Sequence, residues 1–158
     1  METLDSIKSD YELERGKPRP TWNHAILQRR ILLGIAMRYD EQFCVLPELN
    51  LNVGGDKLVP DLAIFSGARS FLETDIQIMT ELPLATVEIL SPSQPVAELT
   101  GKAEQYLQAG VKSCWIVVPE FNQVVISTQA KSYQAFGYHE TLHDPATGIE
   151  LEVASLFR

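Results

Sequence analysis

Two carboxylates stand inside hydrophobic runs of this sequence, where an ionised side chain is costly. Asp61 interrupts the apolar run 58–65, and Glu88 lies within the apolar run 85–90. Burial of a charged group costs several kcal/mol unless a cation, a proton or hydrogen bonds offset it. Two such carboxylates on neighbouring segments, with Lys102 soon after, predict a divalent metal site.

The predicted site has the ligands that Mg2+ prefers. Mg2+ takes one or two carboxylates in proteins and leaves its other positions to water and substrate phosphate. Asp61 and Glu88 would supply these carboxylates, with the carbonyl oxygen of Ile89 as a possible third ligand. Such an ion lowers the pKa of an attacking water and neutralises charge on a scissile phosphate, while a nearby lysine orients the water. Lys102 is the candidate lysine, and the predicted cofactor is Mg2+ or Mn2+.

The first half of the chain must place Asp61. Alternating apolar and charged residues predict a strand at 11–16, and the apolar stripe of residues 27, 31 and 35 predicts a helix over 21–40 that Thr21 caps. A hairpin is expected from strands 43–53 and 57–65 around the turn Gly54-Gly55-Asp56. A polar connection then covers 66–82.

The second half must place Glu88 and Lys102. The pattern predicts strand 84–90, helix 96–109 ending at Gly110, and apolar strand 113–118. This order makes a crossover, so the two strands should be parallel. Further strands are expected near 122–128, 131–137 and 147–153, after which residues 156–157 dock the end of the chain.

Composition indicates one soluble domain. The chain has 158 residues, 45% of them hydrophobic, which suffices for a single core over residues 1–158. Its net charge of -8 gives no broad attraction to nucleic acid or to anionic membranes. No apolar run approaches a membrane span and the N-terminus lacks a signal pattern, so a cytoplasmic protein is expected. Cys44 and Cys114, far apart and flanked by apolar residues, are expected to be buried thiols.

Several short motifs follow one another in a definite order. They are Tyr11-Glu12-Leu13 with Gly16, then His24, Pro60-Asp61, Glu88-Ile89-Leu90-Ser91-Pro92-Ser93, Lys102 with Tyr106, Gly110-Val111, and Trp115-Ile116-Val117-Val118-Pro119. This order resembles that of the Uma-two family of restriction endonucleases, within the PD-(D/E)XK nuclease superfamily. The resemblance covers nearly the whole chain, and the shared order is more specific than any single motif.

The resemblance implies an α/β fold, a restriction-endonuclease-like core of mixed β-sheet flanked by helices. It also implies a Mg2+-dependent phosphodiesterase acting on DNA, with Asp61 and Glu88 as metal-binding acids and His24 and Glu12 nearby. The superfamily's lysine, two residues after the second acid, is replaced here by Leu90. Lys102 matches the helical lysine that substitutes for it in the family. Because a double-strand cut needs two sites, a homodimer is a plausible assembly.

Each of these residues also has an ordinary structural interpretation. Asp61 could cap a turn after Pro60, and Lys102 could pair with Glu98 on the helix surface. Glu12 could be a solvated strand residue, and His24 a polar residue at a helix start. The remaining polar candidates are Ser91 and Ser93, expected to cap the following helix, and Arg29, Arg30 and Arg38, which form either a DNA-facing patch or the solvated side of a helix.

Two other functions stay open at this level. A catalytically weak nucleic-acid-binding or protein-interaction module would explain the acidic net charge and Leu90 in place of lysine. A metal-dependent hydrolase of another phosphoester would use the same acids. A neutral or positive cleft around Asp61 would favour the nuclease over the module.

Overall fold

A six-stranded mixed sheet forms the centre of the computed structural model, which describes residues 9–158. Every neighbouring pair of strands is antiparallel except the parallel pair β5–β6. The predicted mixed sheet and the predicted parallel pair are therefore confirmed. In spatial order the strands are β1 (Phe43–Pro47), β4 (Leu62–Ser66), β5 (Ala85–Ile89), β6 (Ser113–Val118), β7 (Gln123–Gln129) and β8 (Ser132–Phe136).

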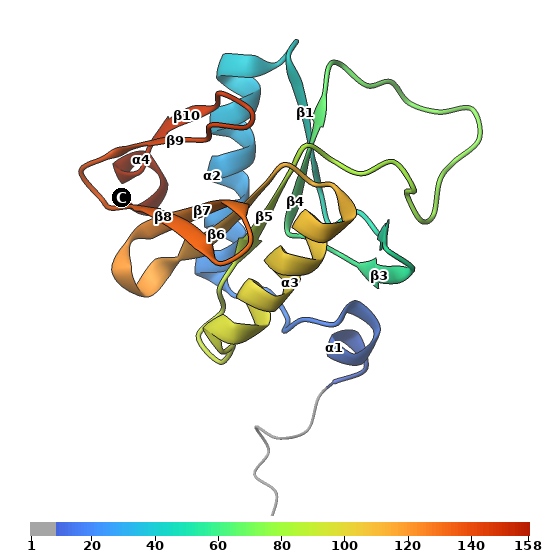
Figure 1. Cartoon of the computed structure of the whole chain (residues 1–158), viewed down its shortest axis with the longest axis horizontal. Coiled ribbons are helices and arrows are strands. Elements are labelled where there is room, and N and C mark those ends of the chain that lie inside the picture. Colours follow the sequence, from blue (N-terminus) through green and yellow to red (C-terminus); the bar gives the residue numbers. More distant parts are fainter. Residues whose placement is uncertain (1–8) are drawn as a thin grey trace, which may run out of the picture.

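Two long helices cover opposite faces of this sheet (Figure 1). Helix α2 (Trp22–Tyr39) buries Leu27, Ile31 and Ile35 against one face, as the four-residue spacing predicts. Helix α3 (Val96–Ala109) packs on the other face and ends at Gly110, whose φ of 116° suits glycine. Each face therefore has its own hydrophobic core.

Strand β5 is divided between these two cores because successive side chains of a strand point to opposite faces. Val87 and Ile89 belong to the core under α2, whereas Leu90 belongs to the core under α3. All five residues of β5 are buried. The alternation puts Glu88 on the α3 face, so it is a carboxylate inside the molecule rather than at its surface.

The predicted hairpin forms, but each of its arms is broken. Strands β2 (Leu51–Val53) and β3 (Asp56–Leu58) pair around Gly54 and Gly55, whose φ values of 61° and 97° favour glycine. They make a separate small sheet, while β1 and β4 pair in the central sheet. The breaks lie at Glu48, which has a φ of 56°, and at residues 59–61. Asp61 consequently stands just before β4 rather than inside a continuous strand.

The strand predicted at 11–16 is wrong: this segment is helix α1 (Asp10–Arg15). The hydroxyl of Ser9 accepts a hydrogen bond from Glu12 N at 3.3 Å, and the Glu12 carboxylate accepts one from Ser9 N at 2.7 Å. This reciprocal capping box starts a helix, and Gly16, with a φ of 70°, ends it. Capping outweighed the short alternation of apolar and charged residues.

The C-terminal segment packs back on α2. Strands β9 (Thr141–His143) and β10 (Glu150–Glu152) form a second small sheet, of which the sequence pattern predicted only the second strand. Helix α4 (Ala154–Phe157) follows and buries Leu156 in the core, as expected. Arg30 donates to Leu156 O at 2.9 Å and Arg38 to Glu150 O at 3.1 Å. These two arginines therefore anchor the C-terminal segment, a contact that neither the DNA-facing patch nor the solvated side of a helix had anticipated.

Two smaller expectations concern the cysteines and membrane spans. Both cysteines are free thiols; Cys114 is buried and Cys44 is half-buried. Among the described residues, no helix is long and apolar enough to cross a membrane. The connection between β4 and β5 forms an exposed loop without regular structure, apart from one bridge between Leu51 and Met79.

Candidate active site

Asp61, just before β4, lies beside Glu88 on the neighbouring strand β5. Leu62 pairs with Val87 in the antiparallel register of β4 and β5, so the next position outward brings Asp61 beside Glu88. The amide of Ile89 donates a hydrogen bond to Asp61 Oδ2 at 2.7 Å. The two residues are only 1% and 4% exposed. The predicted juxtaposition of two buried carboxylates is present.

A buried lysine that the sequence patterns did not single out compensates Asp61. Lys17 Nζ lies 2.7 Å from Asp61 Oδ1 and 2.6 Å from Glu48 Oε2, and Arg15 Nη2 lies 2.8 Å from the same Glu48 oxygen. Burial alone would lower the pKa of Lys17, but the charges of Asp61 and Glu88 outweigh burial and raise it. Lys17 is therefore a permanent ammonium at neutral pH. The sequence indicates such a lysine only indirectly, because two buried carboxylates need a cation to offset their burial.

The first turns of α2 hold Asp61 from the other side. Thr21 caps the helix by accepting a hydrogen bond from His24 N at 3.3 Å, and His24 Nε2 lies 3.1 Å from Asp61 Oδ1. One turn later, Gln28 donates to the Asp61 carbonyl at 2.8 Å and to Glu48 Oε1 at 3.3 Å. Burial would raise the pKa of Asp61, but His24 and Lys17 together lower it. Asp61 is thus a carboxylate fixed on several sides.

Glu88 is held differently. Its Oε1 accepts a hydrogen bond from the hydroxyl of Tyr106 on α3 at 3.0 Å. Burial first, and then the charge of Asp61, raise the pKa of Glu88 to about 7, while Lys102, Lys17 and Tyr106 oppose the shift. Tyr106 belongs to the order of motifs that resembles the family; it is fully buried and also orients this carboxylate. Glu88 therefore titrates near neutral pH.

Lys102 lies within electrostatic range of Glu88, because its charge lowers the pKa of that carboxyl. The alternative ion pair with Glu98 does not form in the described part of the chain, where Glu98 Oε2 instead accepts a hydrogen bond from Gln94 at 3.1 Å. Lys102 is half-buried on α3. Its position is compatible with a role beside Glu88, and its catalytic role stays a prediction.

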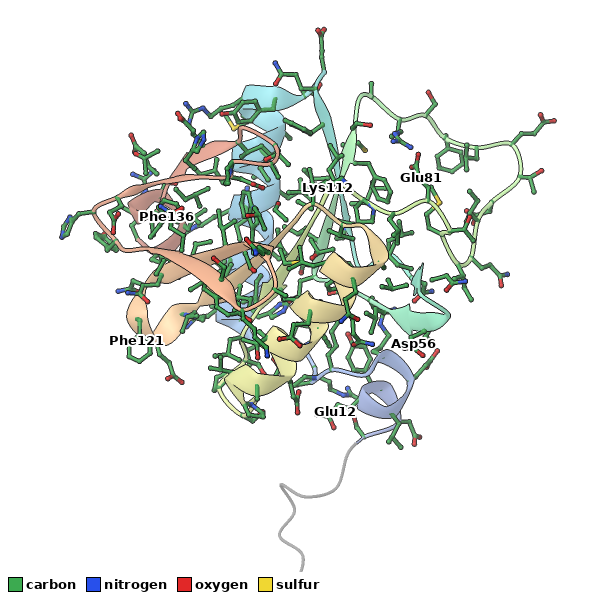
Figure 2. The ribbon with its side chains drawn as sticks, viewed as in Figure 1. Glu12, Asp56, Glu81, Lys112, Phe121 and Phe136 are labelled. Carbon is green, nitrogen blue, oxygen red and sulfur yellow. The ribbon has the colours of Figure 1, made fainter. Side chains whose placement is uncertain are left out.

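Two other predicted residues have different surroundings from those expected. Glu12 lies on α1 (Figure 2), where its carboxylate caps Ser9, and it does not line the cavity beside the acids. The expected cap from Ser91 or Ser93 is wrong: α3 starts at Val96, its N-cap is Pro95 and no side chain caps it. Ser91 Oγ is buried with no hydrogen-bond partner among the described residues. Ser91 instead faces the site.

The acids and several of the surrounding polar groups line one small cavity. Its volume is about 10 Å³, room for about one water-sized atom. No three His, Cys, Asp or Glu side chains of the described residues cluster as a metal site by themselves. Mg2+, however, needs only one or two carboxylates and takes its other ligands from water and substrate. The donor set therefore fits Mg2+. The lining residues are Lys17, Pro18, His24, Asp61, Glu88, Ile89, Ser91 and Gln94.

Comparison with solved structures identifies the class of fold. The chain is similar to the crystal structure of a protein titled a putative nuclease, from Anabaena variabilis ATCC 29413, with a TM-score of 0.75 and 22% identity. The match covers 89% of this chain and 83% of the other. At this identity the likeness shows a shared fold, a mixed sheet flanked by helices as in that nuclease-like structure.

Comparison with family models identifies the family. Residues 4–154 match the model of the Uma2 family, described as "Putative restriction endonuclease", and the chain belongs to this family. The predicted resemblance to the Uma-two family is thereby confirmed. No curated protein matches the chain. Family membership and fold together support a nuclease.

Proposed function

We propose that this protein is a DNA endonuclease of the PD-(D/E)XK type that depends on Mg2+ or Mn2+. One observation carries the proposal: two buried carboxylates, Asp61 and Glu88, line the same small cavity, and their repulsion contributes to a pKa of about 7 at Glu88. Strongly perturbed carboxyls beside a cavity are typical of functional sites. Membership of the Uma2 family supports the same conclusion.

The residues of the site have two roles, to bind the ion and to orient the carboxylates that bind it. Asp61 and Glu88 would hold the ion, and the Ile89 carbonyl is a further candidate ligand. When bound, Mg2+ would supply charge neutralisation at the phosphate and a more acidic water. Lys17 and His24 fix one carboxylate through contacts of 2.7 and 3.1 Å, and Tyr106 fixes the other at 3.0 Å. This orientation limits the reorganisation that the carboxylates need during the reaction.

Lys102 is proposed to orient the attacking water or to stabilise negative charge on the phosphate. Its charge already acts on Glu88. Leu90 stands where the superfamily has its lysine, so a cation must come from another element. Glu12 enters the proposal only through the family resemblance, since its carboxylate is engaged with Ser9.

DNA must be bound through local contacts. With a net charge of -8, the surface as a whole repels phosphate, so DNA must be bound at a local basic patch. Binding at such a patch would make the affinity for DNA fall steeply as salt is added. A homodimer would bring two sites to one duplex, as cutting both strands requires. We propose both the local basic patch and the homodimer.

The test is cleavage of supercoiled plasmid in Mg2+, in Mn2+ and in EDTA. Wild type should nick DNA only with metal. Asp61→Asn and Glu88→Gln should abolish nicking, and Lys102→Met should slow it by roughly 100-fold, the scale of losing one charge-stabilising group. Lys112→Met is the matched control: this exposed lysine, labelled in Figure 2, directly precedes β6, whereas Glu88 pairs with Ile116 further along that strand. Equal nicking by all five proteins would indicate a contaminant and sink the proposal.

A binding module without turnover is the second candidate. One observation favours it: Asp61 Oδ1 already has Lys17 and His24 as partners, so this carboxylate needs no metal for its own neutralisation. Titration calorimetry with Mn2+ separates the two candidates. Binding that Asp61→Asn and Glu88→Gln remove supports the nuclease, whereas no binding at millimolar Mn2+ supports the module.

A further inference from the structure

An apolar groove opens beside the acid site and shares His24 with it. The groove has a volume of about 390 Å³, within the range of pockets that take a small organic group. Trp22, Leu90, Pro92 and Pro119 line it. The groove and the acid-site cavity therefore adjoin at His24.

The wall of the groove suits a base better than a phosphate. Glu120 also lines it and would repel an anion. Leu90, at the position of the superfamily's lysine, lines part of the groove, although it is only 8% exposed and packs in the core under α3. Leucine at this position leaves the groove without the positive charge that a lysine would bring.

Trp22 stands free at the edge of this groove. It is the first residue of α2 and is 81% exposed, so the fold does not need it in a core. It also lines a second hollow, of about 420 Å³, together with Arg30. An indole between two hollows has an accessible ring face. Aromatic rings of this kind bind unpaired bases by stacking, which tolerates any base sequence.

We propose that the groove binds an unpaired nucleobase of the DNA strand whose phosphate lies at Asp61 and Glu88, stacked on Trp22. The inference rests on the proposed function and names its substrate class: single-stranded or locally unpaired DNA rather than intact duplex. Bases in a duplex are already stacked and paired, so only an unpaired base is free to enter the groove.

The tryptophans provide a direct readout. The chain has two tryptophans, and Trp115 is fully buried, so a ligand-dependent change in emission reports on Trp22. The intact protein in EDTA is titrated with an oligothymidylate, with the same strand carrying abasic sites, and with a blunt duplex. Quenching by the oligothymidylate and little change with the other two supports the proposal. Equal quenching by the abasic strand or tighter binding of duplex overturns it.

Variants separate stacking from general affinity. Binding of a dye-labelled oligothymidylate, followed by anisotropy, should weaken about 10-fold or more in Trp22→Ala, the scale of losing one stacked base. Trp22→Phe should recover most of the affinity because it keeps a ring. Phe71→Ala is the matched control, since Phe71 is fully exposed and lies outside the groove. Unchanged affinity in Trp22→Ala overturns the inference.

The two proposals fail in different ways. If plasmid is nicked in Mg2+ but Trp22→Ala keeps the affinity and KM for single strands, the nuclease stands and the stacking site is wrong. If the protein neither binds nor cuts any DNA, both are wrong. A rise in KM of Trp22→Ala on single strands with unchanged kcat supports the stacking site.

Discussion

The ammonium group of Lys17 lies 2.7 Å from Oδ1 of Asp61, although the two residues are 44 positions apart in the chain. Lys17 comes from the connection between α1 and α2, whereas Asp61 precedes a central strand. The segment before the first long helix is thus part of the site. Without it, a buried carboxylate would lose a cation that compensates its burial.

Removal of this cation should be costly. Lys17→Met leaves Asp61 and Glu48 without their ammonium, so we expect a loss of about 3–5 kcal/mol in the free energy of unfolding, measured by urea denaturation at pH 7 in EDTA. Arg69→Met is the matched control, because it breaks an exposed pair of 2.7 Å and should cost at most about 1 kcal/mol. Adding Asp61→Asn to Lys17→Met should recover part of the loss. Equal effects of the two single variants would contradict this assignment.

Glu88 should make stability depend on pH with a definite sign. Its pKa rises from an ordinary 4.5 to about 7 in the folded state. The stability that its bound proton provides is present below about pH 4.5 and is lost as pH rises towards 7. Glu88→Gln should therefore leave the free energy of unfolding almost unchanged at pH 4.5 and should increase it by about 3 kcal/mol at pH 8, measured by urea denaturation. Exposed Glu73→Gln should show no such trend, and a flat difference for Glu88→Gln would contradict the shifted pKa.

Tyr106 should tune the same carboxyl. Its hydroxyl donates to Glu88 Oε1 at 3.0 Å and thereby lowers the pKa of Glu88. Tyr106→Phe should raise that pKa above its value in wild type, followed through the carboxyl carbon chemical shift of Glu88 in an NMR titration. Tyr133→Phe, on the more exposed Tyr133, serves as the control and should leave the titration unchanged. A lower pKa in Tyr106→Phe would show that the hydroxyl plays another role.

A divalent ion should stabilise the folded protein if the acids bind it. At an ion concentration of about 100 times its dissociation constant, binding adds about 2.7 kcal/mol to the free energy of unfolding. Thermal denaturation in Mg2+, compared with NaCl of equal ionic strength, should show an increase in Tm that EDTA reverses. Asp61→Asn and Glu88→Gln should show no increase. An equal increase in these variants would place the ion elsewhere.

The sequence predicted most of the central architecture because its signals are local and strong. The stripe at Leu27, Ile31 and Ile35 defined α2, and the fully apolar run 113–118 defined a strand buried on both faces. Asp61 and Glu88 were found by their cost inside apolar runs. The failures had equally local causes: at 11–16 the capping box of Ser9 and Glu12 outweighed a short alternation.

The rest of the site depends on long-range contacts that no local pattern reveals. Lys17 follows Gly16 in what reads as a plain connection, and Glu48 marks a break in a predicted strand. Their meeting at Asp61 depends on how α1, β1 and β4 pack. Tyr106 is fully buried, and its hydrogen bond to Glu88 could not be read from helical spacing. Sequence patterns therefore found the acids but not the groups that hold them.

The alternation within β5 limits how the chain can change in length. One residue inserted just before Glu88 would turn its side chain towards α2, among leucine and isoleucine, and would remove a carboxylate from the cavity without altering composition. In the exposed connection of residues 67–84, an inserted residue would not turn any strand side chain to the other face of the sheet. We therefore expect relatives to vary in length in that connection, and to keep an unchanged count of residues from the start of β5 to Glu88.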